Sequence, residues 1–129
     1  MKDFDNWNKK KKETHNQEDR LYFRDGEIWW VKLGINIGYE TDGKCSDFTR
    51  PVLILKKYNK YSFLAVPLTS KTKLGLYYFP IGEVDGKEAV GILSQLRNID
   101  SLRLVNKVGV LAEEVLKEIK KAVKKANSL

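Results

Sequence analysis

The feature that most constrains the fold is a series of short apolar segments followed by one change of period. The segments are rich in β-branched and aromatic residues and are separated by turn residues, which is typical of β-strands. Many short strands of this kind favour a barrel or a strongly bent sheet. We expect strands over residues 27–33, 50–58, 61–70 (broken by Pro67), 76–82, 88–94 and within 102–111, with a hairpin turn at 84–87.

From Ala112 to about Asn127 the apolar residues recur at helical spacing, so that one face collects most of them. Glu113 and Glu114 open this segment and lysines close it, as the helix dipole favours. The sequence therefore predicts a mainly β protein: a small barrel of five to seven strands with a C-terminal helix.

The chain of 129 residues fits one domain. Residues 1–20 carry few apolar side chains and are interpreted as a flexible basic and polar extension, and residues 21–129 as the barrel domain. No apolar run approaches the roughly 20 residues that span a bilayer. A single cysteine, Cys45, fits a reducing compartment, so we expect a cytoplasmic protein with no membrane association.

The net charge of +7 is compatible either with a polyanionic partner or with a solvated, lysine-rich surface. One histidine, His15, and one cysteine cannot form the usual zinc cluster, and we expect neither a metal nor a cofactor. Cleavage of RNA through the ribose 2′-OH needs a base, an acid and groups that stabilise the charged phosphorane. In this chain arginine, glutamate, threonine or lysine would have to supply them.

Side chains of these types gather around a glycine-rich loop and at strand ends. Glu40 and Arg50 bracket the loop, Thr69 ends a predicted strand, and Gln95 and Arg97 follow another. Taken singly, each has an ordinary interpretation, such as a surface cation or a turn hydroxyl. Their order along the chain is more informative than any one of them.

In that order, the motifs resemble the PemK/MazF endoribonuclease toxins from about residue 25 to residue 124. The matching segments are Gly26 to Val31, Gly38 to Glu40, Arg50-Pro51, Pro67-Leu68-Thr69-Ser70, Ser94 to Asp100 and Lys107 to Leu111. The loop after Glu40 is longer than in compact members of the family, and Thr41 stands where glutamine is common. The RNA sequence that members of the family cut therefore cannot be transferred to this chain.

The resemblance implies an SH3-like barrel, a homodimer with an RNA groove along its interface, and a cognate antitoxin. It also implies that Arg50 and Thr69 are catalytic. Arg50 could hold a phosphate through two hydrogen bonds, Thr69 could donate to a non-bridging oxygen, and Glu40 is the nearby carboxylate that could accept a proton. The residues expected to bind RNA are Tyr39, Lys44, Phe48, Lys56, Lys57, Ser70, Lys71, Gln95 and Arg97. Tyr39 and Phe48 could equally pack within the loop.

Two other functions remain open at this point. One is a barrel that binds nucleic acid or protein without chemistry, since a fold does not fix a function. The other is a toxin of the gyrase-poisoning type, which the presence of both Arg50 and Thr69 disfavours. If the protein is an enzyme, its activity should require both residues and single-stranded RNA. If it is a binding module, binding should persist when both residues are replaced.

Overall fold

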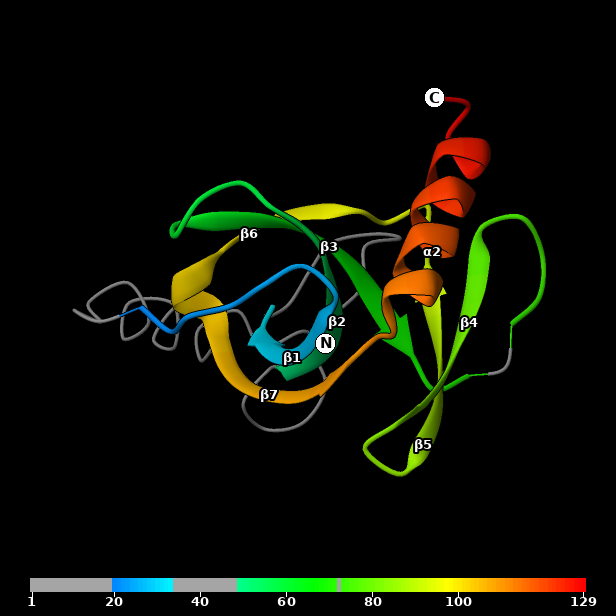
Figure 1. Cartoon of the computed structure of the whole chain (residues 1–129). Coiled ribbons are helices and arrows are strands. Elements are labelled where there is room, and N and C mark those ends of the chain that lie inside the picture. Colours follow the sequence, from blue (N-terminus) through cyan, green and yellow to red (C-terminus); the bar gives the residue numbers. More distant parts are fainter. Residues whose placement is uncertain (1–19, 34–48, 72) are drawn as a thin grey trace, which may run out of the picture.

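The computed structural model describes residues 20–33, 49–71 and 73–129. Figure 1 shows a curled sheet with an α-helix beside it. The elements are β1 (Glu27–Lys32), β2 (Thr49–Lys57), β3 (Ser62–Thr69), β4 (Tyr78–Val84), β5 (Lys87–Ile92), β6 (Arg97–Asp100), the 3-10 turn η1 (Ser101–Arg103), β7 (Leu104–Val110) and α2 (Glu113–Ala126). The predicted class, a mainly β barrel with a C-terminal helix, is confirmed.

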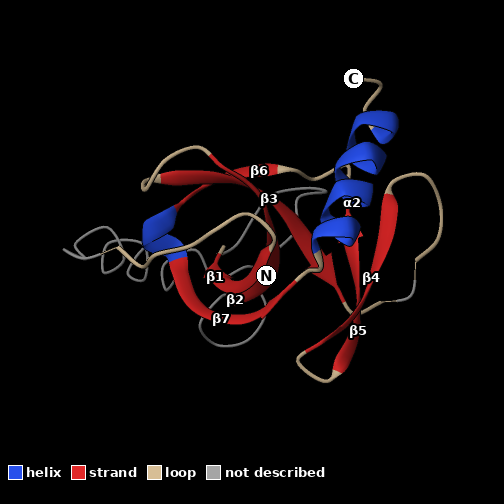
Figure 2. Cartoon of the chain, viewed as in Figure 1, coloured by secondary structure: helices blue, strands red, loops and turns tan. Residues whose placement is uncertain are grey.

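All strand pairs are antiparallel, and the sheet has the order β4-β5-β3-β2-β1-β7 with β6 paired to β3. The long strand β3 pairs with β2 on one edge and with both β6 and β5 on the other. Because β3 has these partners, the sheet curls around one core while the β4–β5 hairpin stands apart beside α2 (Figure 2).

The expected break at Pro67 is wrong, because β3 continues through it and pairs Pro67 with Val52 of β2. Proline has no backbone N–H and is tolerated where no strand needs that donor. On the other edge of β3, β6 pairs as far as Ala65 and β5 pairs from Leu68 onward. Pro67 therefore lies in the gap between two partner strands.

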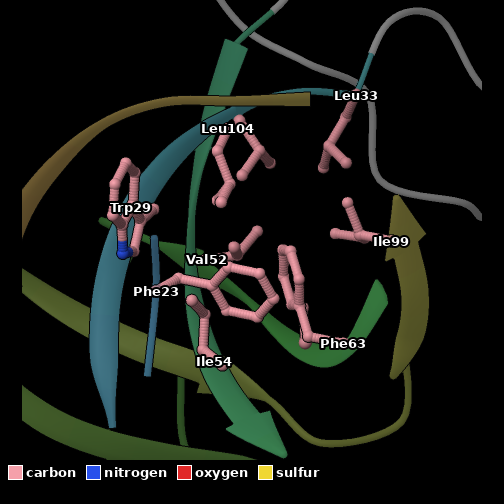
Figure 3. Packing of buried hydrophobic residues seen from close by; sticks show 10 residues of the cluster. Phe23, Trp29, Leu33, Val52, Ile54, Phe63, Ile99 and Leu104 are labelled. Atoms are coloured by element: carbon pink, nitrogen blue, oxygen red, sulfur yellow. The ribbon is translucent and has the colours of Figure 1, made fainter. Parts of the chain in front are cut away.

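The continuous apolar run in β2 is explained by cores on both faces of the sheet. Val52 and Ile54 enter an inner cluster, in which the rings of Phe23 and Phe63 lie 5.0 Å apart (Figure 3). Leu53 and the other alternate residues enter an outer cluster against the helix. Successive side chains of a strand point to opposite faces, so burial on both sides requires apolar residues throughout.

Helix α2 covers the outer cluster with the face that the periodicity predicts. Its buried residues are Ile119, Val123 and Ala126. The helix approaches β5 closely at Gly91, where a Cβ atom would lie 3.1 Å from Val66 Cγ1 and 3.5 Å from Ile119 Cδ1. Any larger residue at Gly91 would push the helix or β3 away.

Two short elements were absent from the sequence prediction. Strand β6 has four residues, of which only Ile99 is buried, and η1 begins where the Asp100 carboxylate accepts a hydrogen bond from Leu102 N at 2.9 Å. The predicted hairpin is confirmed: Asp85 and Gly86 both have positive φ, at 51° and 82°, as the favoured two-residue turn requires.

Glu27 is a buried carboxylate at the start of β1, with 7% of its surface exposed. Its Oε1 accepts hydrogen bonds from Trp29 Nε1 and Arg24 N, both at 3.0 Å, and its Oε2 lies 3.4 Å from Lys107 Nζ. Burial raises the pKa of Glu27, but these donors outweigh burial and hold the pKa below its ordinary value. The ionised form therefore stabilises the fold.

We expect Glu27→Gln to lower the free energy of unfolding by about 1–3 kcal/mol at pH 7, the usual range for hydrogen bonds to charged groups. Because the folded pKa is depressed, this contribution is complete above the unfolded pKa, near 4.3, and is lost as the pH falls through the folded pKa. Urea denaturation at pH 7 and at progressively lower pH should show the two proteins converge. Glu113→Gln, at an exposed carboxylate, is the control. A gap independent of pH would contradict this role.

Candidate active site

Arg50 is the second residue of β2 and pairs with Val31 of β1. Only 6% of its surface is exposed, and the residue takes part in interactions within the chain. It lies on the same face of β2 as Val52, which belongs to the inner cluster. Arg50 is therefore a buried arginine on the inner face of β2.

Thr69 is the last residue of β3, pairs with Val90 of β5 and is also 6% exposed. Its Oγ1 accepts a hydrogen bond from Lys71 N at 3.2 Å. A threonine hydroxyl has one hydrogen to donate and can accept as well. The bond from Lys71 uses an acceptor site and leaves the hydroxyl hydrogen for another group, such as a phosphate oxygen.

The register of β2 and β3 relates these two residues. Val52 pairs with Pro67, and both strands extend two residues beyond this pair, to the positions of Arg50 and Thr69. The β2–β3 pairs end at Val52 and Pro67, and from Leu68 onward β3 pairs with β5 instead. Arg50 and Thr69 therefore lie at the same end of two neighbouring strands. An arginine and a threonine in this relation can both reach one phosphate group.

A second arginine, Arg103, lies near this row and was missed by sequence reasoning. Val31, which pairs with Arg50, also pairs with Leu104 on its other side, and Arg103 immediately precedes Leu104. Arg103 Nη1 donates to Lys32 O at 2.9 Å. Burial lowers the pKa of Arg103, and the neighbouring charge of Arg97 lowers it further.

Arg97 itself lies in β6, on the same face as buried Ile99, and is half-buried. The sequence placed it in a loop after a strand. The signal that could have found Arg103 is Asp100, whose side chain caps η1 and so turns the chain just before β7. Arg97 and Arg103 add positive charge near the end of the barrel where Arg50 lies.

The other predicted residues separate into three groups. Ser70 and Lys71 follow Thr69 directly and are exposed, and Gln95 is half-buried in the turn between β5 and β6. Lys56 and Lys57 lie at the end of β2 that is distant from Arg50. Four predicted residues lie outside the described part of the chain: Tyr39, Glu40, Lys44 and Phe48.

A pocket of about 200 Å³ lies beside Thr69, between β1, β2, β3 and the β4–β5 hairpin. Its lining includes Thr69 itself, together with Ser70, Trp30, Pro51 and Leu68. Arg50 is not among the described residues that line it.

Within residues 20–33, 49–71 and 73–129, no three histidine, cysteine, aspartate or glutamate side chains are grouped so that they could hold a metal ion. In the same part of the chain, no helix has the length and apolar character needed to cross a membrane.

Comparison with solved structures identifies the class of fold. MazF from Deinococcus radiodurans superposes with a TM-score of 0.69 at 23% identity, covering 84% of this chain and all of that one. The Mycobacterium tuberculosis toxin MazF-mt6 gives 0.63 at 18% identity, covering 80% and 97%. A mycobacterial endoribonuclease in complex with its cognate antitoxin gives 0.65 at 16% identity, covering 84% and 97%. At these identities the likeness defines a MazF-type barrel and nothing finer.

The sequence itself places the chain within that class. Residues 24–126 match the family model for the PemK-like, MazF-like toxins of type II toxin–antitoxin systems, and the chain belongs to this family. No curated protein matched the sequence.

Proposed function

We propose that this chain is a toxin-type endoribonuclease that cuts single-stranded messenger RNA by attack of the ribose 2′-OH, without a metal. The observation that carries the proposal is that Arg50 and Thr69, both buried, lie at the same end of the neighbouring strands β2 and β3. A buried arginine and a threonine hydroxyl can donate hydrogen bonds to the equatorial oxygens of a phosphorane, where charge develops. Membership of the toxin family supports the same conclusion.

In the proposed mechanism the 2′ oxygen attacks the adjacent phosphorus, the bond to the 5′ oxygen breaks, and a 2′,3′-cyclic phosphate and a 5′-hydroxyl form. Arg50 holds and neutralises the phosphate through its planar fork of donors. Thr69 donates to a non-bridging oxygen. Glu40, which we assign from the sequence, accepts the 2′-OH proton, and the leaving 5′ oxygen takes a proton from water. Arginine is a poor proton donor because its guanidinium stays protonated in proteins, so we give Arg50 an electrostatic role.

Metal independence is tested by incubating the purified protein with a long unstructured RNA in EDTA. We expect cleavage to persist, because the groups proposed for the site are a cation and a hydroxyl, which stabilise charge directly. The ends should be 2′,3′-cyclic phosphate and 5′-hydroxyl. Strict dependence on Mg²⁺ with 5′-phosphate products would rule out this mechanism. Binding of RNA with no cleavage would favour the non-catalytic barrel.

We also propose a symmetric homodimer, neutralised in the cytoplasm by a cognate antitoxin. Several apolar residues are exposed on the single chain: Leu74, Leu76, Tyr77 and Val110. They form apolar surface that a second chain could bury, and two-fold pairing is the commonest closed assembly. The structures of this fold include a toxin bound to its cognate antitoxin. Light scattering should give twice the 14.9 kDa chain mass. A monomer throughout the micromolar range would contradict the dimer.

A further inference from the structure

A cluster of tyrosines and cations lies at the end of β2 that is distant from Arg50. We call it the tyrosine–cation patch, and its residues are Arg20, Tyr22, Arg24, Lys57, Lys60 and Tyr61. Lys57 ends β2, whereas Arg50 is its second residue. At about 3.3 Å per residue, the seven-residue separation corresponds to roughly 20 Å along the strand. The patch is therefore separate from the proposed cleavage site.

The patch is held together by contacts between residues 20–24 and the β2–β3 turn. Arg20 Nη1 donates to Tyr61 O at 3.3 Å and to Ser101 Oγ at 2.8 Å. Lys57 Nζ donates to Phe23 O at 3.0 Å. These bonds join residues 20–23 to β2, the β2–β3 turn and η1, which lie 34 to 81 residues further along the chain, so the patch is a built surface of the folded domain.

Aromatic rings and cations alternate across this surface. Arg20 lies 4.8 Å and Lys60 5.1 Å from the centre of the Tyr61 ring. Lys57 lies 4.4 Å and Arg24 5.4 Å from the centre of the Tyr22 ring. Even so, Tyr22 is 69% and Tyr61 51% exposed. Both rings therefore keep accessible surface while positive charge is fixed beside them.

The charge of the patch is only partly neutralised. Arg20 pairs with Asp100 at 2.6 Å, and an Asp25 oxygen accepts the backbone N–H of Lys57. Within the described part of the chain, the side chains of Arg24, Lys57 and Lys60 form no ion pair. Three cations beside two exposed rings match a flexible polyanion that also carries flat apolar groups.

We infer that the tyrosine–cation patch is a second docking surface for single-stranded RNA, remote from the Arg50–Thr69 pair. Tyrosine rings stack on unpaired bases whatever their sequence, and the cations neutralise the phosphates between them. The inference rests on the proposed function in taking RNA as the substrate. An RNA that reaches both surfaces is bound more tightly, because docking on the patch raises its effective concentration at the cleavage site.

The test measures binding of 2′-O-methyl RNA, which retains bases and phosphates but cannot react through a 2′-OH. Two lengths are compared by fluorescence anisotropy, about 3 and about 24 nucleotides, which bracket the roughly 4–16 nucleotides that single-strand-binding barrels occupy. The variant Tyr22→Leu/Tyr61→Leu removes the rings, and Tyr22→Phe/Tyr61→Phe is its matched control. Lys60→Gln removes one cation, and Lys121→Gln, at an exposed position of α2, is the control for charge. Thermal melting checks the fold of each variant.

The leucine variant should bind the long RNA about 10-fold or more weakly and the short RNA unchanged, because stacking accounts for at least a 5-fold effect per base. The phenylalanine variant should bind both like the wild type. Lys60→Gln should reduce the slope of log Kd against log salt for the long RNA by about 0.7, the value for one phosphate on a single strand. Lys121→Gln should leave that slope unchanged.

Unchanged long-RNA affinity in the leucine variant, or an equal loss at both lengths, would overturn the proposal. Polyglutamate binding that is lost in the leucine variant while RNA affinity stays unchanged would assign the patch to an acidic protein partner, and also overturn it. Cleavage of unmodified short RNA reports separately on the Arg50–Thr69 site. If the proposed function is wrong, neither the wild type nor any variant should cleave RNA. If only the patch proposal is wrong, cleavage should persist, and the leucine variant should show no loss of affinity that depends on RNA length.

Discussion

Replacement of Arg50 by lysine is expected to slow RNA cleavage by about 10²-fold, the usual loss when one preorganised donor to a developing charge is removed. Lysine keeps the positive charge and most of the buried stem but loses the planar fork that binds two phosphate oxygens. Arg50→Ala should be at least as slow. The measurement is single-turnover cleavage at saturating protein, with RNA affinity determined separately. We expect affinity to fall far less than rate.

The burial of Arg50 demands a control for local destabilisation. Val31 is fully buried and pairs with Arg50 across β1 and β2. Val31→Ala should lower the free energy of unfolding by about 1–3 kcal/mol through a cavity in the same row of the barrel. It removes no group that touches the phosphate, so well below its melting temperature it should cleave close to the wild-type rate. If Val31→Ala slows cleavage as much as Arg50→Lys, the loss reflects packing, and Arg50 has no special chemical role.

The parts of the fold that the sequence predicts well are those whose side-chain period is visible. The segment containing Trp29 and Trp30 reads as a strand, and the spacing of Ile119, Val123 and Ala126 reads as a helix. Strand β6 could not be predicted from the sequence, because four residues with one buried side chain show no recognisable alternation of apolar and polar residues. Its position is set by pairing with β3, which is a long-range contact.

The candidate site, too, could be predicted from the sequence only in part. The motifs named Arg50 and Thr69, but only the pairing of β2 with β3 brings together the strand ends that carry them. The direction of β2 also separates Lys57 from Arg50, although seven residues look close in a sequence. Side chains in a strand become neighbours through register, and register depends on the partner strand.

The hydroxyl of Thr69 can be tested apart from its shape. Thr69→Val keeps the volume of the side chain and removes the donor, whereas Thr69→Ser keeps the donor and removes a methyl group. We expect Thr69→Val to slow cleavage roughly 10-fold or more, since a hydrogen bond to the charged transition state is lost. Thr69→Ser should retain much of the wild-type rate. The lost acceptor for Lys71 N should cost little stability, because Lys71 is exposed and water can replace it.

The double variant Arg50→Lys/Thr69→Val decides whether the two residues act on the same phosphate. Groups that stabilise one transition state as a unit are not additive, so the second substitution should slow cleavage much less in the presence of the first than alone. Independent roles would instead give a rate loss equal to the product of the two single losses. The rates of the wild type, both single variants and the double variant complete the cycle. If the losses multiply, Arg50 and Thr69 at the neighbouring ends of β2 and β3 do not form a common site.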